Sequence, residues 1–416
     1  MSVAENRKGT VTMAFIDTIE DARAALEGVI ERTAMIPAHG LCQAKQVLLK
    51  AENLQKTGSF KIRGAYYRIS RLSDEEKARG VIACSAGNHA QGVALSAKRE
   101  GIKCVICMPE GAPISKVEKT RAHGAEVVLC PGVYDDAYTR ALELQKEHGY
   151  TFIHPFDNLD VIAGQGTIGL EIVEQAPDTD IVFVPVGGGG IIGGIACAIK
   201  NRNPRCKVYG VEPVGAASMR ESIEAGRILT LPSLATMADG IAVKRPGEET
   251  FALCQQYVDG FVCVSESEIA SAMLTLMEDY KVVAEGAGAV SVAAAMYGKV
   301  DVRGKNVCCV VSGGNVDVNV VALIINKGLK KTGRVMEFET VLDDKPRQLK
   351  KLLGILADEG ANILAVQHER ESGDMDVGKC VVGLKLETRG REHIDQITHA
   401  LQSQGYKVYC QNKKYE

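Results

Sequence analysis

The first candidate for a reactive side chain is Lys61, in the segment Thr57-Gly-Ser-Phe-Lys-Ile-Arg-Gly-Ala65. It follows Phe60 and a Gly-Ser pair, where an amphipathic helix is expected to begin. Partial burial beside an aromatic ring and the positive end of a helix both disfavour the ammonium form, which would lower the pKa of this lysine. A neutral lysine amine can attack a carbonyl and form a Schiff base. A solvated lysine in a first helical turn would have the same local sequence, so the interpretation needs support from elsewhere.

Three turns rich in small residues each follow an apolar run: residues 85–92, 187–190 and 312–315. The runs are typical of parallel strands, and ligands of open α/β sheets bind just beyond the carboxyl ends of such strands. The four glycines from Gly187 to Gly190 lead from a strand into a helix, so successive N–H groups can face one anion. They lack the Lys-Ser/Thr of a Walker motif and are no clean dinucleotide fingerprint. A tight turn with close helix packing is the alternative.

A Schiff-base lysine and a separate phosphate cradle on one parallel sheet together predict pyridoxal phosphate. The aldehyde of this cofactor needs a lysine, and its phosphate needs N–H donors. Asn88 can then hydrogen-bond the ring hydroxyl, and Ser312 can meet the ring nitrogen. A non-catalytic protein that binds a nucleotide or an amino acid through the glycine cluster is an alternative of a different class.

These segments, in this order, resemble the threonine/serine dehydratases, which are fold-type II (tryptophan-synthase-β-like) pyridoxal-phosphate enzymes. The resemblance covers roughly Phe15 to Leu329 and rests on residues 58–64, 85–92, 185–190 and 312–315. It implies an α/β catalytic unit of two subdomains. It also implies dehydration and deamination of L-threonine to 2-oxobutanoate and ammonia, and of L-serine to pyruvate.

The resemblance also implies a role for each residue. Lys61 would hold the cofactor as a Schiff base and then remove the α-proton of the substrate. The cofactor contacts would be Phe60, Lys61, Asn88, Gly187, Gly188, Gly189, Gly190 and Ser312. The substrate carboxylate would lie on Ser85, Ala86, Gly87, Asn88 and His89, with His89 expected to begin a helix rather than act as a base.

Two further sets of residues follow from the resemblance. Glu285 is expected near the cofactor ring. Glu212, Ala216 and Ser218 match a site for a monovalent or divalent cation, with a capping or salt-bridging role for Glu212 as the alternative.

Serine racemases share this scaffold, so racemisation is the nearest alternative activity. It needs a second acid or base on the opposite face of the substrate, and in those relatives a serine stands at the position of Ala86. An alanine cannot transfer a proton, which favours the dehydratase. The neutral Ser312 is a weak partner for the ring nitrogen, which favours β-elimination over transamination.

Short apolar strands alternate with helices along the chain, which predicts parallel βαβ units. We expect a disordered lead over residues 1–14 and a catalytic domain over residues 15–330. A small subdomain of approximately residues 60–160 would be inserted in the larger one.

The composition shifts after Lys330, and the order strand-helix-strand-strand-helix-strand over residues 331–416 predicts a ferredoxin-like βαββαβ unit. This unit resembles the ACT domain, an amino-acid-sensing module. The resemblance implies effector contacts at Asp344, Arg347 and Asn362, although many such domains carry glycine where this chain has Arg347. Isoleucine or valine would then shift the activity. A purely oligomer-forming role is the alternative.

The composition is that of an ordinary globular protein: of 416 residues, 46% are hydrophobic and 24% charged, with a net charge of -3. Such a balance favours neither nucleic acid nor an anionic membrane as a partner. The 13 cysteines are scattered singly, often in apolar runs, as in reduced cytoplasmic proteins. We therefore expect a cytoplasmic location and, from the resemblance, a homodimer or homotetramer.

Overall fold

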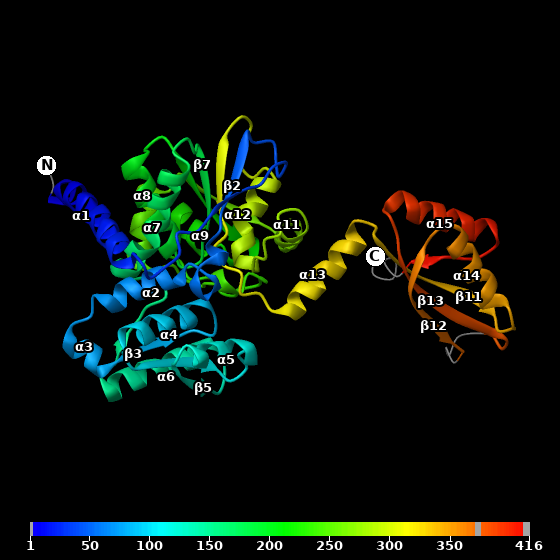
Figure 1. The fold of residues 1–416 in the computed structure, drawn as a ribbon, viewed down its shortest axis with the longest axis horizontal. Helices are drawn as coiled ribbons and strands as arrows, with labels where there is room; N and C mark the ends of the chain where they lie inside the picture. Colours follow the sequence, from blue (N-terminus) through cyan, green and yellow to red (C-terminus); the bar gives the residue numbers. More distant parts are fainter. Residues whose placement is uncertain (1–2, 371–375, 411–416) are drawn as a thin grey trace. The chain divides into compact units, whose positions relative to one another are not determined.

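The computed structural model describes the backbone of residues 3–370 and 376–410, and side chains from Phe15 to Tyr409 within those ranges. The chain divides into two compact units, Met1–Asp317 and Val318–Glu416. No helix among the described residues is both long and apolar enough to cross a membrane. Each unit has its own hydrophobic core, and Figure 1 labels their helices and strands.

The first unit is built on a six-stranded sheet in which every pairing except that of β1 with β2 is parallel. Its central strands are almost wholly apolar, as expected for strands covered on both faces. In sheet order the strands are β1 (Met35–Pro37), β2 (Gln46–Lys50), β10 (Asn306–Val310), β7 (Ile181–Pro185), β8 (Lys207–Pro213) and β9 (Gly260–Val264).

Helices cover both faces of this sheet. One face packs against α1 (Val3–Leu26), α7 (Leu159–Gln175), α8 (Gly190–Arg202) and α10 (Glu248–Tyr257). The strands also contact α12 (Gly286–Met296), which packs on α11 (Glu266–Glu278). The remaining elements are α9 (Ser218–Ala225) and the short turns η1 (Glu52–Leu54), η2 (Lys56–Gly58), η3 (Val214–Ala216) and η4 (Asp239–Ile241).

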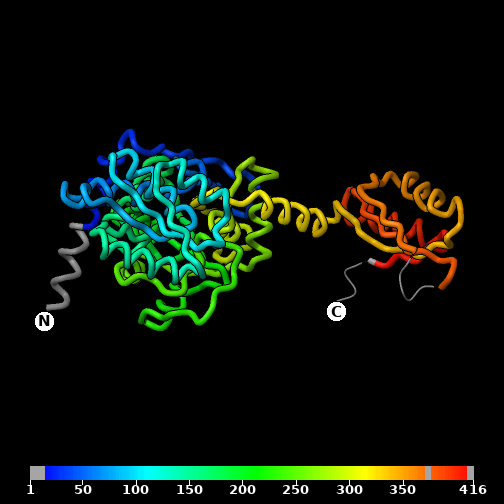
Figure 2. The backbone as a smooth tube through the Cα atoms, turned by 90° about the horizontal axis from the view of Figure 1, so that it is seen from below, coloured from blue at the N-terminus to red at the C-terminus, as the bar shows by residue number. Residues whose placement is uncertain are grey.

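A second, all-parallel sheet is formed by chain that lies between β2 and β7 in sequence. Its order is β5 (Glu126–Cys130), β4 (Cys104–Pro109), β3 (Val81–Cys84) and β6 (Thr151–Phe152). One face packs on α2 (Lys61–Ser70), α4 (Asn88–Glu100) and α5 (Ile114–Ala122), and the other on α6 (Tyr134–His148); α3 (Asp74–Arg79) follows α2. In Figure 2 the chain that forms this second sheet runs from blue through cyan to blue-green, before the green part of the trace re-enters the larger sheet.

The second unit begins with α13 (Val318–Lys331) and continues in the order β11 (Val335–Asp343), α14 (Gln348–Asp358), β12 (Asn362–Glu369), β13 (Lys379–Glu387), α15 (Arg391–Ser403) and β14 (Tyr409–Cys410). Its antiparallel sheet has the order β12-β13-β11-β14. The apolar sides of α14 and α15 meet the sheet around Phe338, Leu352, Leu384 and Ile397. This is the βαββαβ unit that the sequence predicts.

The fold class is confirmed, and the differences lie at element ends and in short elements. The helical backbone of α1 extends back to Val3. This differs from the disordered lead expected over residues 1–14, whose side chains are not described. The apolar run that forms β2 ends as a strand at Lys50, because the chain turns into η1 just after it. Elements β1, α3, β6, α9, α10 and β9 were not expected from the sequence.

Candidate active site

Lys61 is the first residue of α2, and the chain before it is joined to the chain that follows β10. Ser59 forms an isolated antiparallel bridge with Gly313. The Phe60 N–H donates to the carbonyl of Ser312 at 3.1 Å, and the Gly314 N–H donates to the carbonyl of Gly58 at 2.9 Å. Backbone hydrogen bonds therefore fix Lys61 beside the turn that contains Ser312.

The Lys61 amine lies in a largely enclosed, weakly polar environment. Its Nζ donates to the carbonyl oxygen of Pro155 at 2.8 Å and lies 5.2 Å from the centroid of the Phe60 ring. Burial lowers the pKa of Lys61 to about 8, and the nearby carboxylate of Glu285 opposes this shift. With that pKa, about one amine in ten is neutral at pH 7, far more than for a solvated lysine. This environment is suited to Schiff-base formation, as the sequence suggests.

Buried ion pairs, which the sequence did not predict, hold the helix that carries Lys61 in place. Arg63 donates to Glu52 at 2.8 Å and to Glu171 at 2.6 Å, and Lys50 pairs with the same Glu171 at 2.5 Å. Arg63, Glu52 and Lys50 are wholly buried. A guanidinium with two carboxylate partners holds its helix in one position, because any displacement would leave a buried charge unpaired.

Asn88 lies at the centre of a hydrogen-bonded group beside Lys61. Its Nδ2 donates to Oε1 of Glu285 at 2.6 Å, and its Oδ1 accepts from Nδ2 of Asn315 at 2.8 Å. The same Asn315 nitrogen donates to the carbonyl of Thr57 at 2.7 Å. The structure therefore brings Asn88 and Glu285 together with Lys61, as expected, and adds Asn315, whose side chain was given no role.

Glu285 is buried and partly protonated at neutral pH. Burial, assisted by the charge of Asp239, raises the pKa of Glu285 to about 7. A methyl group on Gly313 would lie 2.4 Å from its Oε1 and 3.1 Å from Nδ2 of Asn88. Only glycine therefore fits at position 313 beside this carboxyl group.

The expected substrate contacts lie in the turn between β3 and α4. Ser85, Ala86, Gly87 and Asn88 are half-buried, and the hydroxyl of Ser85 accepts the Gly87 N–H at 3.1 Å. The four residues at the start of a helix leave N–H groups without helical partners, which can bind a carboxylate.

His89 behaves differently from its neighbours in this turn. Its ring is buried, and its Nε2 lies 2.8 Å from the carbonyl of Ile153. Burial lowers the pKa of His89 to about 3, assisted by the positive charge of Lys61. The side chain is therefore a neutral, structural group, which agrees with the expectation that it is not a base.

The four glycines from Gly187 to Gly190 join β7 to α8, and none has room for a side chain. An added Cβ would lie 2.4 Å from the ring of Phe156 at Gly188 and 2.9 Å from its carbonyl oxygen at Gly190. Gly189 has a φ of 95°, in the left-handed region. Among the described residues, the N–H groups of Gly187, Gly188 and Gly189 donate to no backbone carbonyl. A run of N–H donors without backbone acceptors at a helix start fits a phosphate, as the cofactor requires.

The segment His154-Pro-Phe-Asp157, which was given no role from the sequence, supports this cradle. Asp157 accepts the N–H groups of Glu248 and Glu249, each at 3.0 Å, and so caps α10. His154 Nδ1 accepts the Asp157 N–H at 2.8 Å, and burial lowers the pKa of His154 to about 4. The signal that could have found it is a Pro-Phe pair directly flanked by a His and an Asp, just after a short apolar run.

The proposed cation ligands lie together at the end of β8. Glu212 is wholly buried, and its two oxygens accept the N–H groups of Met219 at 2.9 Å and Arg220 at 2.8 Å. Glu212 thus caps α9, one of the alternatives raised by the sequence. Burial nevertheless raises the pKa of Glu212 to about 8. The hydroxyl of Ser218 is buried without a hydrogen-bond partner, and Ala216 lies between the two in the chain.

The second unit contains a cavity of about 290 Å³ at the start of α14. Two of the three expected effector residues, Asp344 and Arg347, line it. Asn362 does not: its side chain donates to Glu387 at 3.0 Å, at the other end of β12. Arg347 has a φ of 78°, a left-handed conformation that glycine adopts more easily.

Comparison with known proteins defines the class of this site. The family described as pyridoxal-phosphate dependent enzyme matches residues 26–313, which lie within the first unit. L-threonine ammonia-lyase of Thermotoga maritima is 51% identical over 398 residues, which make up 95% of this chain and 99% of that protein. L-threonine ammonia-lyase of Geobacter sulfurreducens is 45% identical over 94% of this chain and 98% of that protein.

Solved structures give the same result. The processed form of threonine deaminase isoform 2 from Solanum lycopersicum has a TM-score of 0.72 and 39% identity, covering 75% of this chain and 93% of its own. Maize serine racemase has a TM-score of 0.71 and 36% identity, covering 76% of this chain and 98% of its own. The chain belongs to the family of pyridoxal-phosphate dependent enzymes, and the cofactor expected from the sequence is confirmed.

Proposed function

We propose that this chain is an L-threonine ammonia-lyase, which converts L-threonine to 2-oxobutanoate and ammonia and also acts on L-serine. The observation that carries the proposal is the environment of Lys61. Burial lowers the pKa of its amine to about 8, and backbone hydrogen bonds of the preceding residues hold it beside the Ser312 turn. The two curated relatives above, both named L-threonine ammonia-lyases, extend over nearly the whole chain.

The residues that would hold the cofactor are those named from the sequence. Lys61 would bind its aldehyde, the N–H groups from Gly187 to Gly190 its phosphate, Asn88 its ring hydroxyl and Ser312 its ring nitrogen, with Phe60 against the ring. When bound, pyridoxal phosphate withdraws electrons from the α-carbon of an amino acid and so makes its proton acidic.

The remaining steps fall to side chains of this protein. The N–H groups of residues 85–89 bind the substrate carboxylate and fix the α-carbon near Lys61. The neutral Lys61 amine removes the α-proton as a general base. The β-hydroxyl group would then leave with a proton as water, and the resulting enamine would take up water to give 2-oxobutanoate and ammonia. The neutral Ser312 hydroxyl favours this elimination, because it stabilises negative charge at the α-carbon less than a carboxylate partner of the ring nitrogen would. Glu285, with a pKa near 7, holds Asn88 in place beside the reacting centre.

One assay tests this function against the nearest alternative. Purified protein loaded with pyridoxal phosphate is given L-threonine or L-serine, and both 2-oxoacid and D-amino acid are measured. We expect 2-oxobutanoate from threonine, pyruvate from serine and no accumulation of D-serine, since Ala86 offers no second acid or base. Accumulation of D-serine with little 2-oxoacid would instead identify a racemase.

The second unit is proposed to be a regulatory ACT domain that begins near residue 331, with the catalytic domain over residues 15–330. Its βαββαβ order and the cavity lined by Asp344 and Arg347 support an amino-acid effector. We expect isoleucine or valine to change the rate of 2-oxobutanoate formation. A chain truncated after Leu329 should lose this response, and an unchanged response would remove the proposal.

A cation is proposed at Glu212, Ala216 and Ser218. Two observations support this site. The buried Ser218 hydroxyl has no hydrogen-bond partner and could bind the cation. Burial raises the pKa of Glu212, and a bound cation would stabilise its ionised form. Replacing potassium with a bulky organic cation should lower the thermal stability of the wild type. Ser218→Ala should show a smaller difference between the two salts.

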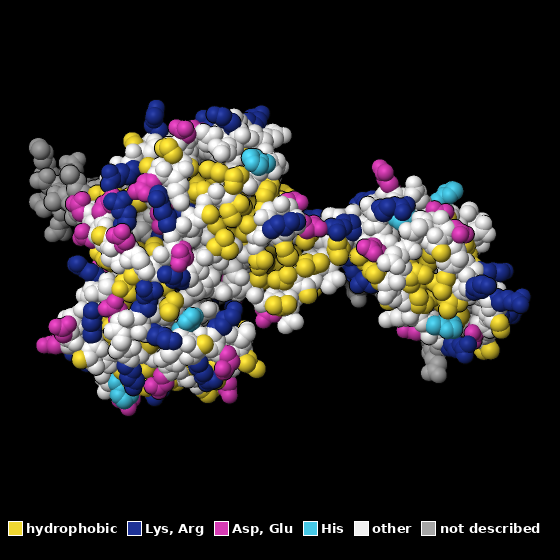
Figure 3. All heavy atoms as spheres, viewed as in Figure 1, with side chains coloured by type: hydrophobic (Ala, Val, Ile, Leu, Met, Phe, Trp, Pro, Cys, Tyr) yellow, Lys and Arg dark blue, Asp and Glu magenta, His cyan; other side chains and the backbone are white. Residues whose placement is uncertain are grey.

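Apolar side chains on the second unit support a homo-oligomer, a dimer or a tetramer. Val318, Val320 and Leu323 are exposed on α13, where Figure 3 shows hydrophobic side chains gathered at the surface. Leu364 and Val366 are exposed on β12, which pairs only with β13 among the strands that the structure describes. A second copy would cover such surfaces. Light scattering measures the mass of the assembly directly.

We propose a cytoplasmic location for the protein. Fractionation of cells that express it tests this proposal.

A further inference from the structure

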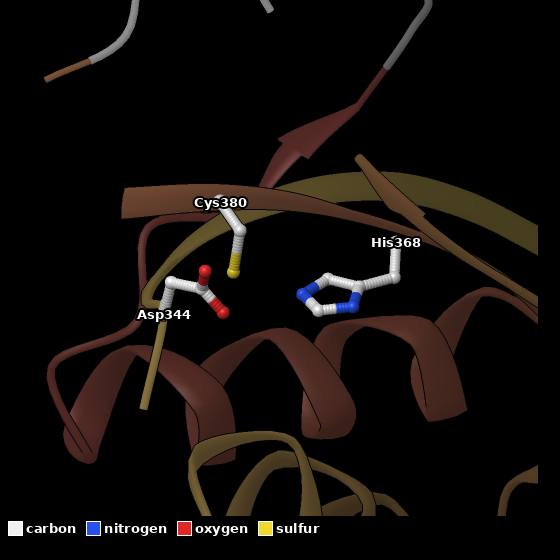
Figure 4. Close-up of side chains that lie close together, drawn as sticks. All are labelled: Asp344, His368 and Cys380. Carbon is white, nitrogen blue, oxygen red and sulfur yellow. The ribbon is translucent and has the colours of Figure 1, made fainter. Parts of the chain in front are cut away.

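Three side chains of the second unit that carry potential metal ligands turn toward one another (Figure 4). They are Asp344, His368 and Cys380, and one ligand atom from each lies within 4.8 Å of the other two. Cys380 is buried, Asp344 half-buried and His368 exposed, so the group lies between the core and solvent. Among the described residues no other group of three such side chains meets this condition.

The pairing of three adjacent strands produces this arrangement. Cys380 lies on β13, directly opposite Leu342 of β11, and Asp344 follows the last residue of β11. His368 of β12 lies opposite Val382, two positions along β13 from Cys380 and on the same face. Residues at such diagonal positions are close enough for long side chains to meet. The sheet thus brings together three ligands that are far apart in the sequence.

We propose that Asp344, His368 and Cys380 form a binding site for a divalent zinc-class cation. Thiolate, imidazole and carboxylate are the three ligand types that zinc uses in proteins, at roughly 2.0–2.3 Å. A tetrahedral ion with such bonds holds its ligand atoms about 3.5 Å apart. The three ligand atoms already lie within 4.8 Å of one another. Side-chain rotations that move these atoms by about an ångström would therefore close the site.

The charges of the three ligands suit a dication. A carboxylate, a thiolate and a neutral imidazole together carry two negative charges, which the ion neutralises. Calcium and magnesium prefer oxygen ligands only, so the thiol and the imidazole select a softer metal.

Two existing interactions must give way when the ion binds. Nη2 of Arg370 lies 3.1 Å from Oδ1 of Asp344, and the Cys380 thiol lies 3.7 Å from the carbonyl of Leu342. The ion would displace the largely exposed guanidinium from the carboxylate. It would also displace the thiol proton, so binding releases one proton to the solvent.

Three protein ligands leave a fourth position of a tetrahedral ion open. All three residues line the cavity at the start of α14, together with Arg347. The open position would therefore accept water or a small anionic ligand that enters this cavity, as in zinc sites that bind exchangeable ligands. This inference does not depend on the proposed ammonia-lyase activity, which arises in the first unit.

The test measures zinc binding by the full chain, loaded with its cofactor and freed of unbound cofactor, in competition with a chromophoric chelator. We expect one site per chain in the wild type. His368→Ala, which changes an exposed side chain, and Cys380→Ser should each weaken zinc binding at least about 100-fold. Cobalt should give a thiolate-to-metal absorption band in the wild type that Cys380→Ser lacks.

Matched controls separate this site from other histidines and thiols. His399→Ala changes another exposed histidine of the same unit, and Cys42→Ser changes a half-buried thiol of the first unit; both should bind zinc as the wild type does. Arg370→Ala should tighten binding several-fold, because it frees Asp344. The proposal is overturned if the wild type shows no site, or if His368→Ala and Cys380→Ser bind zinc as tightly as their controls.

Discussion

The region around Lys61 and the cavity at the start of α14 hold their functional groups in opposite ways. In the first, buried ion pairs and backbone hydrogen bonds hold the helix of Lys61, and Asn88 is hydrogen-bonded to Glu285. Burial shifts the pKa values of Lys61 and Glu285 toward neutrality. In the second, the charged groups are half-exposed and their ion pairs reach solvent. The first arrangement suits proton transfer, which needs fixed geometry and a pKa near the working pH, whereas the second suits reversible binding.

The largest expected effect that separates the two regions is that of Lys61→Ala on activity. We expect the release of 2-oxobutanoate to fall at least about 10³-fold, because both the Schiff-base amine and the general base are lost. The visible absorption of the cofactor bound to lysine should disappear with it. Lys345→Ala, which removes a largely exposed lysine at the cavity of the second unit, should leave the rate without effector within about twofold. Comparable activity of the two variants would sink the assignment of Lys61.

The next largest effect is expected at Arg63, since its loss leaves Glu52 and Glu171 buried without a full partner. Arg63→Met should lower the free energy of unfolding by about 3–5 kcal/mol, measured by urea denaturation. Arg68→Met is the matched control on the same helix, because Arg68 pairs with Asp160 in a partly exposed position and should cost less than about 1 kcal/mol. Equal losses would mean that the buried pairs do not fix α2.

The sequence predicted the parts of this site that lie in short continuous segments. Lys61, Asn88, the four glycines and Ser312 each lie in a short segment whose composition indicates its function. Three of these segments follow the carboxyl ends of parallel strands, β3 in the smaller sheet and β7 and β10 in the larger one. The Arg63 pairs were missed because Glu171 lies 108 residues away in sequence and on another helix. The carbonyl of Pro155 was missed because a backbone oxygen has no signature of its own.

The second unit shows the same limit more strongly. The order of its strands and helices follows from periodicity alone. The meeting of Asp344, His368 and Cys380 depends on the register of three strands, which no local spacing reveals. Asn362 was placed at the effector site by resemblance, yet its side chain pairs with Glu387 instead.

The two regions also differ in how pH affects stability, because Glu285 makes the stability of the region around Lys61 depend on pH. In the unfolded chain this carboxyl group releases its proton near its ordinary pKa of 4.5, but burial raises the folded value to about 7. The folded state is therefore progressively disfavoured as pH rises from about 4.5 to 7, by up to about 3 kcal/mol. Glu285→Gln should remove this slope when cofactor-free protein is denatured with urea across that range. The exposed Glu221→Gln is the control, and a slope unchanged by Glu285→Gln would rule out this origin.

The smallest expected effect lies in the second unit, at the left-handed Arg347. A non-glycine residue in that conformation costs roughly 1–2 kcal/mol, part of which glycine recovers despite its greater freedom in the unfolded chain. Arg347→Gly should therefore stabilise the protein by about 0.5–1 kcal/mol, seen as a small rise in thermal midpoint.

Gln348→Gly provides the matched control, because it places glycine one residue later, at the first residue of α14, where the backbone is helical and glycine should cost up to about 1 kcal/mol. Opposite signs at adjacent positions would show that backbone conformation, and not loss of a side chain, sets the result. If both variants lose stability, the arginine side chain must contribute more to the second unit than its strained backbone costs. The cavity would then resemble the first site, with a fixed group at its centre, and the contrast between the two regions would no longer hold.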